Sequence, residues 1–328
     1  MREPLSHPGQ RALDVVERSA AAAGTAGFLA DVVAGLSAEP KTLPAKYFYD
    51  AAGSALFEEI TRLPEYYPTR AEIAVLRLHG SAIGALVPAN GVLVEFGSGS
   101  STKIRILLDQ LPDLGTYVPV DVSAEWLRAE AGRLRADYPR FAVHPVVADF
   151  TRPFPLPAEA AARPKAGFFP GSTIGNFDPP EAVAFLAHAR RVLGPGGTLN
   201  VGVDLVKDTA VLNAAYDDAA GVTARFNRNM LVRINRELGA DFDLAAFSHR
   251  AFFNTAQSRI EMHLVSGTQQ VVEVGRHRFT FRTGETIHTE NSYKYTVEGF
   301  QGLARNAGWQ PLQVWTDPDS LFSVHGLG

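Results

Sequence analysis

The chain has no cysteine, and its 31 Lys and Arg residues nearly balance its 35 Asp and Glu residues. The missing thiols exclude disulfides, cysteine nucleophiles, Cys-ligated zinc and Cys-ligated iron–sulfur clusters. The net charge of −4 lacks the basic footprint that nucleic-acid-binding domains carry. The nine histidines are scattered without H-x-x-x-H spacing, so we expect no metal site.

Long apolar runs are also scarce. The uncharged stretch 81–94 is shorter than the ~20 residues that span a bilayer. The start, MREPLSHPGQ, lacks the apolar core of a secretory signal. We therefore expect a cytoplasmic protein that contacts no membrane. With 46% hydrophobic residues over 328 positions, the chain can bury a sizeable core in roughly one to three domains.

Between residues 91 and 207, short apolar runs alternate with helical patterns. The patterns predict strands over 92–96, 116–121, 141–149, 165–171 and 197–205, and helices over 102–110, 124–136 and 180–193. This alternation indicates βαβ units around a parallel sheet. Nearly continuous apolar strands such as VLVEF (92–96) favour a sheet that is covered on both faces. Upstream, the spacing predicts helices over 11–36, 55–62 and 69–84.

The alternation lapses after residue 207. A long helical pattern over 208–238 is followed by strand-like runs over 249–254, 259–267, 269–274 and 277–283. The tail returns to the earlier pattern, with a helix over 297–307 and strands over 311–317 and 320–327. We therefore predict an α+β insertion over about 208–293, and we expect the final strands to complete the first sheet.

A glycine loop, VEFGSGSSTK (94–103), lies where the first predicted strand turns into a helix. Gly97 and Gly99 allow close approach of the backbone to a ligand, and a helix N-terminus follows. The dinucleotide fingerprint requires a third glycine where this chain has Thr102, which argues against NAD and favours a smaller nucleoside that bears a carboxylate. Asp121 and Asp149 end the next two strands, where they could bind ribose hydroxyls and an adenine amino group. Each acid also fits an ordinary turn or helix cap.

Several longer stretches resemble one family. They are residues 43–72 (LPAKYFYDAAGSALFEEITRLPEYYPTRAE), the glycine loop, FPGSTIGNF (169–177), residues 204–229 (DLVKD…YDDAAGVTARFNRN) and IHTENSYKY (287–295). Together they look like the histidine-specific, S-adenosylmethionine-dependent methyltransferases. The resemblance implies a Rossmann-like class I methyltransferase sheet with an inserted α+β substrate-binding domain. It also implies a cofactor-binding domain over 70–206 plus 294–328 and a substrate-binding domain over 11–69 plus 207–293.

The family's best-known activity converts L-histidine to hercynine by N-alpha-trimethylation, the first step of ergothioneine biosynthesis. The resemblance therefore implies S-adenosylmethionine as cofactor and L-histidine as substrate, and we expect the protein to work as a monomer. Matched residue by residue, the cofactor would be held by Gly97, Lys103, Asp121, Asp149 and Phe150. A cation in the first turn of a helix opposes the helix dipole, so Lys103 is expected to meet a carboxylate, and the cofactor's methionyl group would supply one.

The family's substrate-binding residues match Tyr66, Asn176, Tyr216, Glu290 and Ser292, and Met262 is expected to line the same pocket. Asn176 and Tyr216 would bind the substrate carboxylate. Glu290 and Ser292 would read the two nitrogens of the imidazole, and an unpaired acid disfavours apolar side chains.

Tyr49 is the candidate catalytic residue, because its hydroxyl could hydrogen-bond the amine and orient its lone pair. Its alternative interpretation is a core aromatic. The rival substrate is another amino acid such as a tryptophan derivative, since some relatives methylate a prenylated tryptophan. A rival from another class is a module that binds the cofactor without chemistry.

Overall fold

The computed structural model describes residues 25–99 and 101–328, which form two compact units. The larger unit contains Glu58–Ala219, Phe252–Ile260 and Asn291–Gly328. The smaller unit contains the described residues up to Phe57, together with Ala220–Ala251 and Glu261–Glu290. Two assignments stay predictions: a cofactor-binding domain over 70–206 plus 294–328 and a substrate-binding domain over 11–69 plus 207–293. The division into two compact units does not show which ligand each unit binds.

The larger unit is built on an eight-stranded sheet. In spatial order its strands are β13 (Pro311–Thr316), β14 (Phe322–Leu327), β7 (Thr198–Asp204), β6 (Lys165–Phe169), β2 (Val92–Phe96), β3 (Thr116–Asp121) and β4 (Ala142–Val143), and β5 (Val146–Val147) also pairs with β3. Strands β2 to β7 pair in parallel, whereas β14 is antiparallel to both β7 and β13. The predicted Rossmann-like sheet is confirmed, as is the return of the last two strands to it.

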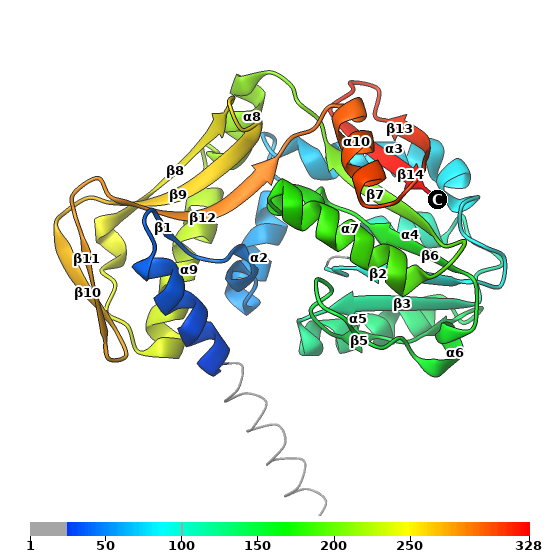
Figure 1. The fold of residues 1–328 in the computed structure, drawn as a ribbon, viewed down its shortest axis with the longest axis horizontal. Coiled ribbons are helices and arrows are strands. Elements are labelled where there is room, and N and C mark those ends of the chain that lie inside the picture. Colours follow the sequence, from blue (N-terminus) through cyan, green and yellow to red (C-terminus); the bar gives the residue numbers. More distant parts are fainter. Residues whose placement is uncertain (1–24, 100) are drawn as a thin grey trace, which may run out of the picture. The chain divides into compact units, whose positions relative to one another are not determined.

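Helices cover both faces of this sheet (Figure 1). They are α3 (Tyr67–Gly84), α4 (Thr102–Leu108), α5 (Ala124–Asp137), α6 (Ala158–Ala161), α7 (Pro179–Leu193) and α10 (Val297–Asn306). Side chains alternate along a strand, and β7 shows the consequence. Leu199, Val201 and Val203 join a core cluster with residues of α7 and α10, whereas Gly202 faces Glu72 of α3. The continuous apolar character of these strands follows from burial on both sides.

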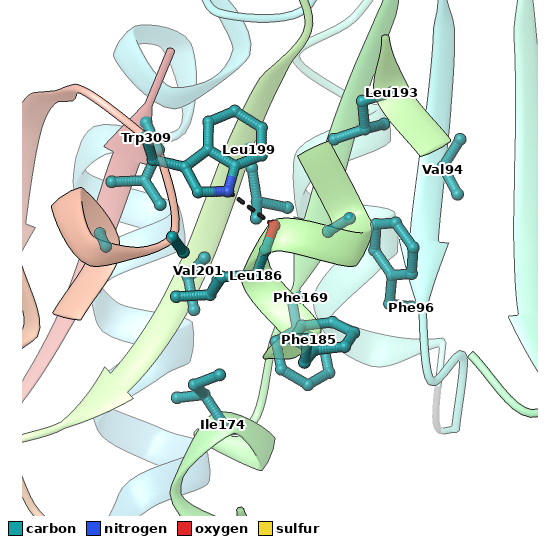
Figure 2. Close-up of a cluster of buried hydrophobic side chains, with 14 of the residues drawn as sticks. Val94, Phe96, Phe169, Ile174, Phe185, Leu186, Leu193, Leu199, Val201 and Trp309 are labelled. Carbon is teal, nitrogen blue, oxygen red and sulfur yellow. Dashed lines mark hydrogen bonds between the residues drawn. The ribbon is translucent and has the colours of Figure 1, made fainter. Parts of the chain in front are cut away.

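The core on the α7 side is dense in aromatic rings (Figure 2). The rings of Phe185 and Phe169 lie 4.4 Å apart between centroids, and Phe96 meets Phe185 edge-on at 5.7 Å. The buried Trp309 satisfies its indole N–H by donating to the Leu186 carbonyl at 2.9 Å. This bond ties the segment after α10 to the middle of α7, so the C-terminal strands are held to the same core.

Three predicted elements differ from the structure. The strand predicted over 141–149 is two short strands, β4 and β5, because Pro145 between them has no N–H to donate to a neighbouring strand. The helix predicted over 208–238 is broken into α8 (Thr209–Tyr216) and α9 (Val222–Leu238), where Gly221 adopts a φ of +67°. The helix predicted over 11–36 is observed over 25–37, and its first part lies outside the described residues.

A second sheet has the strand order β1 (Lys41–Thr42), β12 (Thr286–Tyr293), β9 (Arg259–Ser266) and β8 (Phe247–Asn254), and β10 (Gln270–Val274) forms a hairpin with β11 (His277–Phe281). Strand β12 was not among the predicted strands. The remaining elements are α2 (Ala51–Ile60) and the 3₁₀ turns η1 (Ala45–Phe48), η2 (Thr173–Asn176) and η3 (Leu244–Ala246).

In the smaller unit, α9 buries Phe226, Met230 and Ile234 at a spacing of four residues, and Phe48 stacks on Phe226 with ring centroids 4.5 Å apart. No helix in the described ranges is both long and apolar enough to cross a membrane.

One buried carboxyl lies inside the sheet of the larger unit. Glu95, on β2, is only 2% exposed, and the Tyr117 hydroxyl of β3 donates to it. Burial raises the pKa of Glu95 to about 7, although its hydrogen bonds with Tyr117 and Ser98 lower it in part. An acid whose pKa is higher in the folded state stabilises the fold below its unfolded pKa, and this stability is lost as the pH rises towards 7.

We therefore predict that wild-type protein loses about 1 kcal/mol more unfolding free energy than Glu95→Gln between pH 6 and pH 8. Urea unfolding at the two pH values measures this difference. Glu298→Gln, at an exposed position of α10, is the matched control and should keep the wild-type pH dependence. Parallel pH dependences of wild type and Glu95→Gln would contradict the assignment.

Candidate functional site

The glycine loop connects β2 to α4 at the carboxyl edge of the larger sheet. Gly97 has a φ of +76°, which side-chain-bearing residues rarely adopt. A Cβ at Gly97 would lie 3.2 Å from Cε1 of Phe150, so the structure brings these two predicted cofactor residues together. Phe150 is fixed in turn by edge-on contacts with Phe169 and Phe185. The backbone of the loop at Gly97 and the ring of Phe150 therefore lie against each other at this edge of the sheet.

Trp126 also fixes this loop, and the sequence reasoning missed it. The residue lies in the first turn of α5, and its indole Nε1 donates to the Gly99 carbonyl at 3.0 Å. Its side chain is nevertheless 43% exposed, which is unusual for a tryptophan that serves only the core. The available signal was a large aromatic residue shortly after Asp121, on the helix that follows the second strand.

Lys103, on α4, contacts a carboxylate within the protein. Its Nζ lies 2.6 Å from Oε2 of Glu72, which is fully buried in α3, while the Lys103 side chain is 18% exposed. The Gly171 N–H also donates to both oxygens of Glu72, at 2.9 and 3.0 Å. A Cβ at Gly202 would lie 2.2 Å from Oε1 of Glu72, so any larger residue there would displace this carboxylate from its partners. Lys103 therefore pairs with Glu72, which the sequence reasoning did not single out, and its expected contact with the cofactor's carboxylate stays a prediction.

Asp121 and Asp149 follow neighbouring strands, because Asp121 of β3 pairs with Val147 of β5. Oδ1 of Asp121 accepts the Ser123 N–H at 2.9 Å, and burial raises the pKa of this carboxyl. Oδ1 of Asp149 accepts the N–H and the hydroxyl of Thr151 at 3.0 and 2.5 Å. Both acids thus shape the turns after their strands, in agreement with the turn-cap alternative. The same bonds hold each carboxylate in a fixed orientation at the edge of the sheet.

Three predicted substrate residues of the larger unit lie together. The rings of Tyr66 and Tyr216 meet edge-on, with centroids 6.1 Å apart, and the hydroxyls of Tyr216 and Ser292 lie 2.8 Å from each other. Tyr66 caps the start of α3, Tyr216 ends α8, and Ser292 lies on β12. All three are mostly buried. The arrangement places two aromatic rings beside the paired hydroxyls of Tyr216 and Ser292, which suits a ligand that has both a cationic and a hydrogen-bonding part.

A buried ionic cluster lies beside these hydroxyls. Asp204, at the end of β7, accepts hydrogen bonds from Tyr67 at 2.8 and 2.9 Å and pairs with Lys207 at 2.6 Å and with Lys294 at 2.7 Å. The positive charges hold the pKa of Asp204 below its usual value despite complete burial. The sequence reasoning quoted the motifs that contain Asp204 and Lys294 but assigned neither residue a role. A lysine in a polar stretch of sequence is usually exposed, so the sequence did not indicate that Lys294 is buried.

Asn176 ends the 3₁₀ turn η2, which begins after Ser172 at a φ of +54°. A Cβ at Gly175 would lie 2.7 Å from the Tyr293 carbonyl. Glycine therefore lets this turn, of which Asn176 is the last residue, pack directly on the backbone of β12.

The other predicted residues belong to the smaller unit. Tyr49 packs edge-on against Phe57 and Phe226, with centroids 5.7 and 5.9 Å apart, yet remains 36% exposed. Met262, on β9, is buried, and the Thr289 hydroxyl donates to its carbonyl at 3.0 Å. Glu290, on β12, is partly buried, and its carbonyl lies 3.1 Å from Nε2 of His288.

Glu261, His263 and His288 form the group of potential metal ligands found among the described residues, with ligand atoms within 4.8 Å of one another. The two imidazole rings are stacked, with planes 19° apart and centroids 4.6 Å apart. Lone pairs of ring nitrogens lie in the ring planes, so nearly parallel rings cannot both direct a lone pair at one ion. The geometry therefore gives no support for a metal bound by both histidines.

Comparisons with known proteins identify the family of the chain. A family model described as "Histidine-specific methyltransferase, SAM-dependent" matches residues 28–328. Histidine N-alpha-methyltransferase of Mycolicibacterium smegmatis is 46% identical over 299 residues, covering 90% of this chain and 92% of that protein. The protein of the same name from Mycobacterium tuberculosis is 44% identical, covering 91% of this chain and 95% of that protein. Ergothioneine biosynthesis protein 1 of Neurospora crassa is 29% identical, and the match covers 84% of this chain but 32% of that protein. The chain belongs to the histidine-specific methyltransferases, which use S-adenosylmethionine as their cofactor.

Proposed function

We propose that this enzyme transfers methyl groups from S-adenosylmethionine to the α-amino nitrogen of L-histidine, three times in succession, to give hercynine. This is the first step of ergothioneine biosynthesis. The observation that carries the proposal is the 46% identity, over 90% of the chain, to a protein named Histidine N-alpha-methyltransferase. The cluster of Tyr66, Tyr216 and Ser292 supports it, because it offers hydroxyls and aromatic faces to a charged amino acid.

The loop edge of the larger sheet fits the cofactor. The φ of +76° at Gly97 and its tight approach to Phe150 both disfavour a side chain, so the backbone there is kept open, and Phe150 is proposed to offer an aromatic face to the adenine. Asp121 is proposed to accept from the ribose hydroxyls and Asp149 from the adenine amino group. Lys103 has three N–H donors, so its bond to Glu72 leaves donors for the cofactor's carboxylate.

The substrate is proposed to bind through its charged and polar groups. Asn176 and Tyr216 would donate to the carboxylate, and Glu290 and Ser292 would read the two ring nitrogens. Tyr66 and Met262 would line the pocket. Aromatic faces are suitable neighbours for the quaternary ammonium that forms after the last methyl transfer, and Tyr66 and Tyr216 supply two of them.

S-adenosylmethionine supplies an electrophilic methyl group that is bonded to a sulfonium sulfur. When the methyl group is transferred, the sulfur leaves as a neutral thioether and needs no protonation. The substrate amine must present a lone pair, so its ammonium has to lose a proton. The α-amino group of a peptide titrates near ~8 and that of a free amino acid about a unit higher, so deprotonation at neutral pH costs about 1.4–2.7 kcal/mol. This is small beside the ~8 kcal/mol or more that an enzyme supplies, and alignment of the reacting atoms should dominate. The Tyr49 hydroxyl is proposed to orient the amine lone pair.

The balanced charge of the chain supports a small-molecule substrate rather than a nucleic acid. The monomeric state and the cytoplasmic location stay predictions.

Mass spectrometry of products tests the proposal directly. Purified protein is incubated with S-adenosylmethionine and one amino acid in each of several parallel reactions. The amino acids are L-histidine, L-tryptophan and the others in turn. We expect a product from histidine alone that is heavier by three methyl groups. Turnover of a tryptophan derivative or another amine in place of histidine would overturn the assigned specificity while leaving the cofactor in place. Cofactor binding without turnover of any amine would favour the non-catalytic module.

Replacement of Asn176 by alanine removes a proposed carboxylate donor. We predict that Asn176→Ala lowers kcat/KM for histidine at least tenfold, since one hydrogen bond to a charged group is worth about 1.5–3 kcal/mol. Steady-state kinetics at saturating cofactor measures the change. Asn306→Ala, at the exposed end of α10, is the matched control and should remain within twofold of wild type. A kcat/KM of Asn176→Ala within threefold of wild type would remove Asn176 from the site.

A further inference from the structure

Glu72 is a buried acid that joins two elements beside the proposed cofactor site. It lies in the second turn of α3 and is 0% exposed. Its Oε2 pairs with the Lys103 ammonium of α4 at 2.6 Å. Both of its oxygens also accept the Gly171 N–H, at 2.9 and 3.0 Å. A carboxylate is stable in a protein interior only with such partners, so Glu72 holds the ammonium and the backbone of the turn after β6 at one point.

Two glycines leave the space that this arrangement needs. A Cβ at Gly202 of β7 would lie 2.2 Å from Oε1 of Glu72, which is closer than non-bonded atoms approach. Gly171 has a φ of +81°, and a Cβ there would lie 3.4 Å from the Lys103 ammonium. The carboxylate therefore packs directly on the backbone of β7, and the ammonium lies beside the backbone at Gly171.

Lys103 lies where two neighbouring strands end. Strands β2 and β6 pair in parallel, so the glycine loop after β2 and the Gly171 turn after β6 meet at the carboxyl edge of the sheet. Open α/β sheets bind ligands outside this edge. The Lys103 side chain is 18% exposed, whereas that of Glu72 is 0% exposed. Of the two side chains, only that of Lys103 can be reached by a ligand at this edge.

An anchored lysine has an advantage in binding a ligand. A lysine side chain has several rotatable bonds, and fixing it on a ligand costs conformational entropy. An ion pair that holds the ammonium before the ligand arrives removes part of this cost. An ammonium has three N–H donors, so one lysine can bind two carboxylates at the same time. The pairing of Lys103 with Glu72 is therefore compatible with a second bond to a carboxylate ligand.

We propose that Glu72 is a positioning residue that fixes the Lys103 ammonium, together with the Gly171 turn, for the methionyl carboxylate of S-adenosylmethionine. This role rests on the proposed function, since it takes Lys103 as the contact of that carboxylate. It goes further, because Glu72 acts through Lys103 and not by contact with the cofactor. Glu72 then sets the affinity for the amino-acid end of the cofactor and leaves the affinity for its nucleoside end unchanged.

Two ligands separate these two ends. S-adenosylhomocysteine has the amino-acid carboxylate, whereas 5′-methylthioadenosine keeps the adenosine and the thioether sulfur but has no carboxylate. Calorimetry measures the Kd of both for wild type, Glu72→Gln and Lys103→Met. An amide has one acceptor oxygen and no charge, so Glu72→Gln should weaken S-adenosylhomocysteine at least tenfold and 5′-methylthioadenosine less than twofold. A folded Glu72→Gln protein with unchanged affinity for S-adenosylhomocysteine would overturn the proposal, as would an equal loss for both ligands.

Glu130→Gln is the matched control. Glu130, on α5, is 5% exposed and pairs with Arg105 of α4 at 3.4 Å and with Arg133 at 2.6 Å. It is also a buried acid that binds a cation of α4, but it does not contact Lys103. We expect Glu130→Gln to lower Tm while the Kd of S-adenosylhomocysteine stays within threefold of wild type. A tenfold weakening in this variant as well would show a general effect of losing a buried acid and would contradict the specific role of Glu72.

A double variant shows whether Glu72 acts through Lys103. Residues that act through one contact have non-additive effects. The double variant of Glu72→Gln and Lys103→Met should therefore bind S-adenosylhomocysteine about as weakly as Lys103→Met alone. A weakening equal to the product of the two single effects would show that Glu72 acts independently and would overturn the proposal.

A crystal structure of the wild-type protein with S-adenosylhomocysteine needs no variant to fold. We expect the Lys103 ammonium to lie within hydrogen-bond distance of both Glu72 and the ligand carboxylate. An ammonium that leaves Glu72 in order to bind this carboxylate would overturn the proposal.

The failure of each assignment gives a different result. Unchanged affinity of Lys103→Met for S-adenosylhomocysteine would refute the proposed contact of Lys103 with the cofactor, and with it the role of Glu72. Weaker binding in Lys103→Met but not in Glu72→Gln would refute the role of Glu72 alone. The binding measurements contain no amine substrate, so the histidine assignment is decided separately by the product screen.

Discussion

The buried carboxylate of Asp204 is the interaction on which the proposed substrate site depends. It ends β7, which pairs with β14 and β6. It binds the start of α3 through Tyr67, the turn after β7 through Lys207 and the residue after β12 through Lys294. Removing one partner of such a pair leaves an uncompensated buried charge, which typically costs about 3–5 kcal/mol. A site anchored in this way keeps its geometry before any ligand arrives, and this preorganisation favours alignment of the reacting atoms.

The proposed cofactor site shows the same arrangement with different residues. Glu72 is buried in α3, receives the Gly171 N–H and pairs with Lys103 of α4. Gly202 leaves the room that Glu72 needs. In both places a fully buried acid fixes a lysine beside the carboxyl edge of the sheet. Both acids are connected to α3. Asp204 accepts from Tyr67, the first residue of this helix, and Glu72 lies in its second turn. This one helix therefore couples the loop that is proposed to hold the cofactor with the hydroxyls that are proposed to hold the substrate.

Much of the larger sheet could be predicted from the sequence, because its strands are continuous apolar runs. Strands β2 and β3 have the predicted bounds, 92–96 and 116–121. The prediction over 141–149 overlooked Pro145, which interrupts pairing with β3. Strand β12 escaped prediction because its sequence, TIHTENSY, is mostly polar. Its polar residues do not follow a simple alternation, and the strand carries the candidate residues Glu290 and Ser292.

The candidate site was predictable only residue by residue, through resemblance of motifs. Gly97 and Phe150 lie against each other, and Tyr66, Tyr216 and Ser292 form one cluster. What no local pattern could show are the buried partners, Glu72 for Lys103 and Asp204 for Lys294. These contacts join residues up to 90 positions apart in the chain, so they exist only once the fold has formed.

A crystal structure of the enzyme with S-adenosylhomocysteine and L-histidine would test the central claim most directly. The account predicts that an acceptor atom of histidine lies within hydrogen-bond distance of either the Tyr216 or the Ser292 hydroxyl. Lys294, which donates to both hydroxyls and pairs with Asp204, should keep these contacts. Histidine bound away from the hydroxyl pair, or a Lys294 ammonium that leaves Asp204 to bind the substrate itself, would contradict it.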